Sequence, residues 1–209
     1  MNNKHFDELK IFFFDVIDYL CAGYDFNFFL SSPTYENYWN WYKSLNEEPE
    51  GITFANGMSK MVIIVDYGFG KKWVAKIPFS ETVVDYCELE ENNYKGAVAY
   101  CVQEAFAETF CIGGYPSDES KFKVYLMARA DTDEDELYSH SSSYDSDDYN
   151  CETCMNGEVV NCLGDFFSCE FMDRLMEFCE EYSISDIHES NVGFSNGRPL
   201  IIDYSGYMG

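Results

Sequence analysis

The dipeptide Asn196-Gly197 lies between two apolar runs near the end of the chain, residues 192–194 and 199–204. Both turn residues tolerate positive φ, so this pattern is the strongest short-range signal for a two-residue β-hairpin. A hairpin brings the residues before its first strand close to those after its second strand. We therefore expect the loop before Val192 to lie near Asp203.

Three residues with oxygen-bearing side chains flank the expected hairpin: Asp186, Asn191 and Asp203. If they converge, these oxygens suit a hard cation such as Mg²⁺ that also holds phosphate oxygens. A carboxylate that does not bind the metal could orient the hydroxyl of a nucleophile. The alternative is a surface hairpin with incidental acids, which is common in a chain this acidic.

This stretch resembles the catalytic core of the protein-kinase-like superfamily. Asp186 and Asn191 stand five apart, as in the Asp-x-x-x-x-Asn catalytic loop, and Asp-Ile-His-Glu-Ser-Asn is similar to the Asp-Leu-His-x-Gly-Asn of small-molecule and atypical kinases. Asp203-Tyr-Ser-Gly stands where the metal-binding Asp-Phe-Gly would be, with one extra residue before the glycine. The resemblance implies that Asp186 is the catalytic base and that Asn191 and Asp203 bind Mg²⁺.

Three strands are expected upstream, joined by short glycine-containing connections that predict an antiparallel meander. Their ranges are residues 52–55, 61–66 and 73–79. In a kinase the first connection covers the ATP phosphates. Here it has one glycine, Gly57, followed by Ser59 and Lys60, which the resemblance makes candidate cofactor-binding residues. It departs from the Gly-x-Gly-x-x-Gly pattern, and a plain hairpin turn is the alternative.

Lys76 lies in the middle of the third expected strand, in Val74-Ala75-Lys76-Ile77. Alternation places Val74 and Lys76 on one face of the strand and Ala75 and Ile77 on the other. An inward lysine needs a partner because burying its charge is costly. It resembles the kinase strand lysine that contacts the ATP phosphates and a helix glutamate. The alternative is a lysine that simply faces solvent.

Residues 86–110 have a helical pattern, as one helix or two. The family needs one inward glutamate on this helix to hold Lys76. Glu90 and Glu91 both lie three or four residues before Tyr94, so spacing does not choose between them. We take Glu91.

The remaining pattern predicts an α+β, protein-kinase-like fold with an antiparallel sheet and a reduced helical lobe. Strands are expected at residues 110–114 and 122–130, and on resemblance residues 126–129 form the hinge that holds an adenine ring. Helices are expected at residues 6–22, 35–45 and 166–182. The expected parts are an N-terminal helical segment (1–50), a kinase-like N-lobe (51–130), an acidic flexible insert (131–150) and a reduced C-lobe (151–209).

The chain ends at Gly209, three residues after Gly206. A typical kinase continues with an activation segment and further helices that bind substrate. We therefore expect either that the two N-terminal helices replace part of the C-lobe, or that the protein no longer phosphorylates a substrate in the usual way.

Cysteines occur nine times, which is an odd number scattered through apolar patterns. In an intracellular protein most of them are small buried apolar residues. Cys151 and Cys154, followed by Cys162 and Cys169, raise the alternative of a zinc site. No second Cys-x-x-Cys and no suitably spaced histidine accompany them, so we favour burial.

The net charge of −25 excludes a protein that binds DNA or RNA directly, because phosphates would be repelled. Anionic membrane surfaces are excluded for the same reason. With no signal peptide and no spanning apolar run, we expect a cytoplasmic protein. On the kinase resemblance, we expect it to be of bacterial or phage type. The first hypothesis is a minimal kinase-like enzyme that uses ATP and Mg²⁺. The second is an inactive, pseudokinase-like acidic protein that binds or inhibits a basic, nucleic-acid-binding partner.

Overall fold

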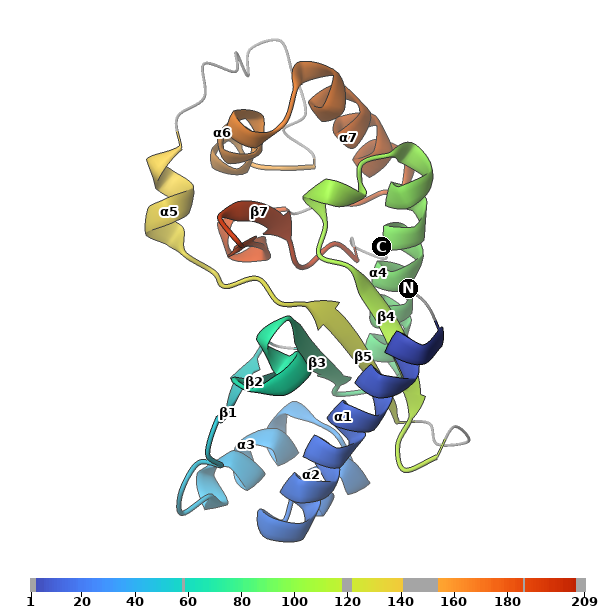
Figure 1. Ribbon diagram of the computed structural model, residues 1–209, viewed down its shortest axis with the longest axis vertical. Coiled ribbons are helices and arrows are strands. Elements are labelled where there is room, and N and C mark those ends of the chain that lie inside the picture. Colours follow the sequence, from blue (N-terminus) through green and yellow to red (C-terminus); the bar gives the residue numbers. More distant parts are fainter. Residues whose placement is uncertain (1–2, 58, 118–121, 141–153, 186, 206–209) are drawn as a thin grey trace. The chain divides into compact units, whose positions relative to one another are not determined.

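The computed structural model describes residues 3–57, 59–117, 122–140, 154–185 and 187–205 (Figure 1). The chain divides into two compact units. Unit 1 comprises residues 1–88 and 109–129, and unit 2 comprises residues 89–108 and 130–209. The fold is α+β, as the sequence predicts, with an antiparallel sheet of five strands and several helices.

The sheet belongs to unit 1, and every pairing in it is antiparallel. Its strands are β1 (Ile52–Asn56), β2 (Lys60–Val65), β3 (Trp73–Pro78), β4 (Thr109–Gly114) and β5 (Lys123–Ala128). Their order is β1-β2-β3-β5-β4. The five predicted strands are confirmed with small shifts of their ends. The short η1 (Gly68–Lys71) connects β2 to β3.

The register of the sheet separates its two faces. Ala75 lies opposite Ile63 and Leu126, and residues that face each other across strands project to the same side. All three are fully buried in the main core of unit 1. The neighbouring positions, with Lys76 opposite Val62 and Tyr125, project to the other side of the sheet.

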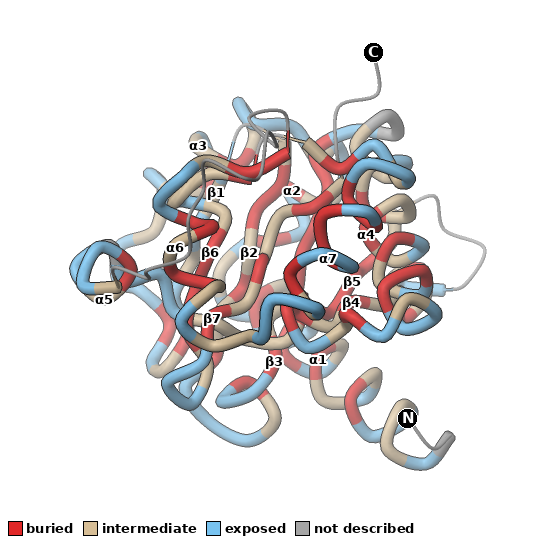
Figure 2. Tube along the Cα trace, turned by 90° about the horizontal axis from the view of Figure 1, so that it is seen from above, coloured by how far each residue is buried: buried red, intermediate tan, exposed pale blue. Residues whose placement is uncertain are grey.

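Three helices complete the core of unit 1: α1 (Asn3–Gly23), α2 (Asn27–Ser31) and α3 (Tyr35–Ser44). Four residues of α1 at helical spacing are fully buried: Leu9, Phe13, Ile17 and Leu20. Burying each such side chain contributes about 1.5–3 kcal/mol. These helices share one core with β1, β2 and β3, so segment 1–50 joins the sheet and replaces no part of a helical lobe. Figure 2 colours the buried residues red.

Helix α4 (Glu81–Tyr100) begins and ends earlier than the predicted range of 86–110. At its start, the Oγ of Ser80 accepts the Val83 N–H at 3.3 Å, a capping bond that the prediction overlooked. At its end, Cys101 has a φ of 59°. A left-handed residue stops a helix, so the chain passes into η2 (Gln103–Ala105) and then β4.

The acidic segment 131–150 is not entirely irregular, contrary to our expectation. Helix α5 (Glu134–Ser139) forms within it, and the side chain of Asp133 caps the helix by accepting the Glu136 N–H at 3.0 Å. Leu137 is buried and anchors this helix within unit 2. The prediction gave weight to the many acids of this segment. It overlooked the apolar residue Leu137 and the capping residue Asp133. Residues 141–150 lie outside the described part of the chain.

We predicted one helix in this part of the chain, at 166–182, and the structure has two between residues 157 and 181. Helix α6 (Gly157–Phe166) was not predicted, and helix α7 (Cys169–Glu181) begins later than expected. The Ser168 Oγ accepts the Phe171 N–H at 3.3 Å, which caps α7 and separates it from α6. The buried face of α7 consists of Met172, Leu175, Met176, Phe178 and Cys179.

The predicted C-terminal hairpin is confirmed in unit 2. After η4 (Glu189–Asn191) come β6 (Val192–Ser195) and β7 (Arg198–Ile201). Asn196 and Gly197 have φ values of 53° and 70°, as a tight hairpin turn with two left-handed residues requires.

Gly193 of β6 lies against the chain at Ala130. Phe194 and Asp131 exchange two backbone hydrogen bonds, of 2.8 and 3.0 Å, which hold the segments together. A Cβ on Gly193 would lie 3.0 Å from the Ala130 Cβ and 3.1 Å from its carbonyl oxygen. These distances are tighter than most Cβ contacts, so a side chain here would require Ala130 to shift by a few tenths of an ångström, and glycine avoids that shift.

Replacing Gly193 with valine is expected to lower the free energy of unfolding by about 1–3 kcal/mol, because the added side chain overpacks the contact with Ala130. Urea unfolding followed by circular dichroism measures the change. Gly157→Ala is the control, because nothing lies within 4 Å of its Cβ position. Equal stability of the two variants would contradict the assigned contact.

Candidate functional site

Lys76 of β3 is buried, with 4% of its surface exposed. The interpretation that this lysine faces solvent is therefore excluded. Its side chain projects from the sheet face opposite the apolar core, alongside Val62 and Tyr125. A buried ammonium group has lost most of its hydrating water. It therefore interacts strongly with an anion that lies next to it.

Lys60 lies on the same face as Lys76. It is the first residue of β2, is 9% exposed and stands two positions before Val62, which lies opposite Lys76. Unit 1 thus carries two nearly buried lysines on adjacent strands, on one side of the sheet. This arrangement raises the positive charge of a face that is otherwise mostly apolar.

The turn before β2 is closed by its own backbone. The Gly57 N–H donates to the Lys60 carbonyl at 3.0 Å, and the Ser59 carbonyl accepts the Phe79 N–H at 2.9 Å. Because the Gly57 amide is already used, it cannot also cradle a phosphate. The backbone of this turn is therefore that of a plain hairpin, which was the alternative. The side chain of Lys60 provides positive charge at the turn.

The two candidate glutamates of α4 have different surroundings. Glu90 is fully buried. The Glu91 carboxylate lies 2.7 Å from the Lys95 Nζ, one helical turn away, and this lysine is largely exposed. Burial thus distinguishes two acids that spacing from Tyr94 does not. Asn93 and Ala97, which are also buried, lie three and seven residues after Glu90, on the same side of α4.

Asn93 holds the C-terminal segment in unit 2. Its Nδ2 donates to the Tyr204 carbonyl at 2.8 Å, and the Tyr204 hydroxyl donates to the Ala107 carbonyl at 2.6 Å. The Tyr204 ring meets the Phe106 ring edge to face at 5.0 Å. These contacts fix the residue that directly follows Asp203. Sequence reasoning missed both Asn93 and Tyr204.

The hairpin brings Asn191 and Asp203 together, as the turn chemistry predicts. The Ile202 N–H donates to the Asn191 carbonyl at 2.8 Å, directly beyond the Val192–Ile201 pair of the ladder. Asn191 and Asp203 are both half-buried. Their side-chain oxygens are hard donors of the kind that Mg²⁺ takes, with water and phosphate oxygens completing an octahedral shell.

The pKa of Tyr204 is raised well above its usual value. Burial is the main cause, and the negative charges of Glu90, Glu108 and Asp203 add to it. Carboxylates from α4, from the loop before β4 and from the C-terminal segment thus act on one buried phenol. These charges and the burial both disfavour ionisation of the phenol.

Asp186, the predicted catalytic base, lies outside the described residues. Its neighbour Ile187 is buried, and the Ile187 N–H donates to the Cys154 carbonyl at 2.9 Å. The Asn156 N–H returns a bond of 3.0 Å to the Ile187 carbonyl. The backbone just after Asp186 is therefore paired with the chain before α6.

The zinc alternative gains no support. Cys151 lies outside the described residues, Cys154 and Cys162 are buried, and Cys169 is exposed. Within the described ranges, no three His, Cys, Asp or Glu side chains are grouped so that they could hold a metal ion.

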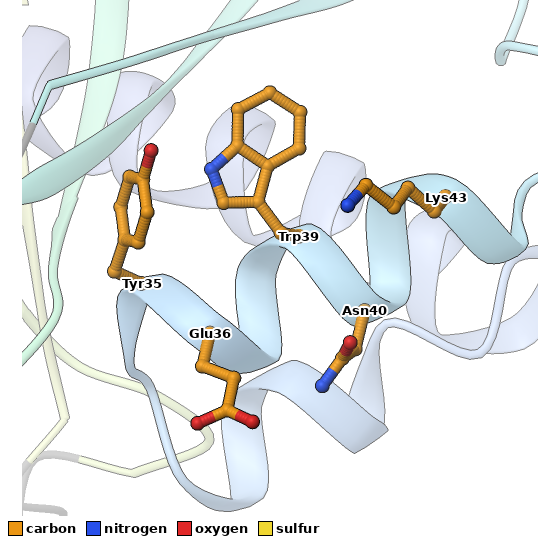
Figure 3. A pocket seen from close by; sticks show the side chains of 5 residues that line it. All are labelled: Tyr35, Glu36, Trp39, Asn40 and Lys43. Atoms are coloured by element: carbon orange, nitrogen blue, oxygen red, sulfur yellow. The ribbon is translucent and has the colours of Figure 1, made fainter.

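A surface hollow of about 530 Å³ lies along helix α3 in unit 1 (Figure 3). Its lining residues are Tyr35, Glu36, Trp39, Asn40 and Lys43. The Lys43 Nζ lies 5.7 Å from the centre of the Trp39 ring, a cation–π distance. Tyr38 and Trp41 of the same helix are buried and pack in the core of unit 1. None of the predicted site residues lines the hollow.

Comparison with protein families, with curated proteins and with solved structures finds no match for this chain. The kinase-like assignment therefore stays a prediction that depends on the residues and the fold.

None of the helices in the described part of the chain is both long enough and apolar enough to cross a membrane.

Tyr204→Phe is expected to lower the free energy of unfolding at neutral pH by about 0.5–1.5 kcal/mol, because the bond to the Ala107 carbonyl is lost. This difference should shrink above about pH 10, where the unfolded phenol ionises. A phenol with a raised pKa in the folded state contributes stability below the unfolded pKa and loses it as pH rises. Chemical unfolding of both proteins across alkaline pH measures the difference. A gap that is constant with pH would contradict the assigned environment of Tyr204.

Proposed function

We propose that this protein is a kinase-like protein that binds ATP with Mg²⁺ and transfers the γ-phosphoryl group to a substrate. The observation that carries the proposal is the buried Lys76 on the central strand of an antiparallel sheet. The resemblance expects a lysine at this position of the sheet to contact the phosphates of ATP. The order of elements, with three strands, a helix and two more strands, supports the resemblance.

In this proposal the two lysines of unit 1 neutralise phosphate charge. Lys76 contacts the α- and β-phosphates, as the resemblance implies. Lys60 adds positive charge at a turn whose Gly57 N–H is already bonded to the Lys60 carbonyl. Two ammonium groups on one sheet face suit a polyphosphate better than a singly charged anion.

In unit 2, Asn191 and Asp203 are the proposed Mg²⁺ ligands. Their support is the hairpin, whose Ile202–Asn191 hydrogen bond brings both residues to one end of the ladder. The metal would bridge phosphate oxygens and neutralise the charge that develops during transfer. Asp186 keeps the role of catalytic base on resemblance alone.

Glu90, rather than Glu91, is the better candidate for the helix glutamate. A carboxylate that orients a lysine acts most strongly where water is excluded, and Glu90 is fully buried. Glu91 is engaged with Lys95 on the helix surface.

Calorimetry with Mg-ATP tests the proposal. Lys76→Ala is expected to weaken binding about tenfold or more, because a charge-assisted hydrogen bond is lost. Asp203→Ala is expected to remove the dependence of ATP binding on Mg²⁺, which a titration in chelator measures. Lys71→Ala and Asp173→Ala are matched controls, because both side chains are exposed.

Absence of Mg-ATP binding by the wild-type protein would refute the nucleotide proposal. Equal loss in Lys76→Ala and Lys71→Ala would refute the assigned role of Lys76. Glu90→Gln and Glu91→Gln form a second matched pair, and a larger loss in Glu91→Gln would restore the original choice.

A second candidate function is that of a non-catalytic acidic protein that binds a basic, nucleic-acid-binding partner. The distribution of charge favours it. Of the 13 Lys and Arg residues, unit 2 contains Lys95, Arg174 and Arg198. One face of α7 exposes a row of acids: Glu170, Asp173, Glu177, Glu180 and Glu181. Such a surface attracts basic proteins at low salt.

Affinity capture from a host lysate at low and high salt tests this second function. A basic protein should be retained at low salt and released at high salt, and Glu177→Gln with Glu180→Gln should retain less of it. The matched control is Asp7→Asn with Asp15→Asn, two exposed acids of α1, which removes the same charge from unit 1. Capture that is insensitive to salt, or equal for both variants, would count against the α7 surface.

A further inference from the structure

Exposed tyrosines gather near the end of α1 in unit 1. Tyr19 and Tyr67 are 46% and 44% exposed, although such large rings are usually covered. The Tyr24 ring meets the Tyr19 ring edge to face at 5.5 Å, and the two hydroxyl oxygens lie 3.2 Å apart. We call Tyr19, Tyr24 and Tyr67 the tyrosine surface.

Contacts with the core of unit 1 hold these rings in place. The Phe12 ring meets the Tyr67 ring edge to face at 5.9 Å. The Trp41 Nε1 donates to the Tyr24 carbonyl at 2.7 Å. Gly51, with a φ of 69°, passes close to Tyr67, and its Cβ position lies 3.2 Å from that ring. Rings that are already ordered lose little entropy when a partner binds.

Two exposed carboxylates accompany the rings. Glu47 and Glu50 lie on the connection between α3 and β1 and are exposed. The pKa of Tyr24 is raised by its hydrogen bond with Tyr19 and by partial burial, and also by the charges of Glu47 and Glu50. The pKa of Tyr67 is raised by burial and by Tyr19. Glu50 directly precedes Gly51, whose Cβ position lies 3.2 Å from the Tyr67 ring, so this carboxylate and the rings share one region.

We propose that the tyrosine surface, with Glu47 and Glu50, binds an arginine-rich segment of a basic protein. A guanidinium group stacks on a tyrosine face and pairs with a carboxylate at its edge, which an ammonium group does less well. The net charge of −25 repels nucleic acids and acidic proteins and attracts a basic partner. The rings then supply the short-range contacts that set affinity. This inference does not depend on nucleotide binding.

A labelled synthetic peptide of alternating arginine and glycine is the probe, and fluorescence anisotropy measures its binding. The salt concentration is about 0.15 M, where charges farther apart than about 8 Å are largely screened. The double variant Tyr19→Ala, Tyr67→Ala should weaken binding about tenfold, because two cation–π contacts are lost. It leaves the net charge unchanged, so the long-range field of the protein stays the same.

Two further variants separate this surface from general acidity. Tyr19→Phe with Tyr67→Phe keeps the ring faces and should bind as the wild type does. Glu177→Gln with Glu180→Gln removes charge from α7 and should change the affinity less than twofold at this salt. Unchanged binding by the alanine variant, a larger loss from the α7 variant, or no binding by the wild type would each overturn the proposal. Circular dichroism verifies that each variant is folded.

Discussion

Burial of the Lys76 ammonium is the constraint on which the candidate site depends. The register of β3 against β2 and β5 places this side chain opposite Val62 and Tyr125, away from the apolar core. A slip of one residue would move the lysine into that core and expose Ala75 in its place. The chemistry of unit 1 therefore depends on strand pairing as much as on the lysine itself.

In unit 2 the polar groups near Asp203 are also held in fixed positions, but strand pairing is not what holds them. There a helix, rather than a sheet, fixes the polar groups: Asn93 of α4 holds the Tyr204 carbonyl, and the Tyr204 hydroxyl reaches the Ala107 carbonyl. Both bonds are buried, where an unsatisfied polar group costs about 1–3 kcal/mol. Asp203 is thus attached to a segment that has few alternative positions.

The elements that the sequence predicted well are those set by local rules. Asn196-Gly197 specified its turn through the left-handed conformation that both residues tolerate, and the alternation of β3 specified which neighbours share a face with Lys76. The predicted ends of helices were wrong where a single residue determines the position at which the helix begins or ends. Ser80 and Ser168 begin helices through capping bonds, and Cys101 ends one through an unusual φ. Each of these signals is weaker than the apolar periodicity around it.

The roles of the candidate site residues stay predictions, and only part of their placement follows from local rules. Asn191 and Asp203 follow from the hairpin, which is local. The distinction between Glu90 and Glu91 depends on which side of α4 is covered, and Tyr204 gains its role from residues about a hundred positions away, Asn93 and Ala107. Such long-range contacts leave no trace in spacing, so reading the residues before Tyr94 could not reveal them.

The two-residue turn at Asn196-Gly197 has a consequence for how this region can change over time. Exposed loop tips ordinarily accept insertions and deletions, because little is packed against them. Here the tip is exposed, but the length of the turn sets the register in which β6 pairs with β7. A single added or lost residue would reverse the facing of one strand and separate Asp203 from Asn191. The pairing of the strands therefore restricts the length of this bend, and the positive φ of both residues restricts its composition.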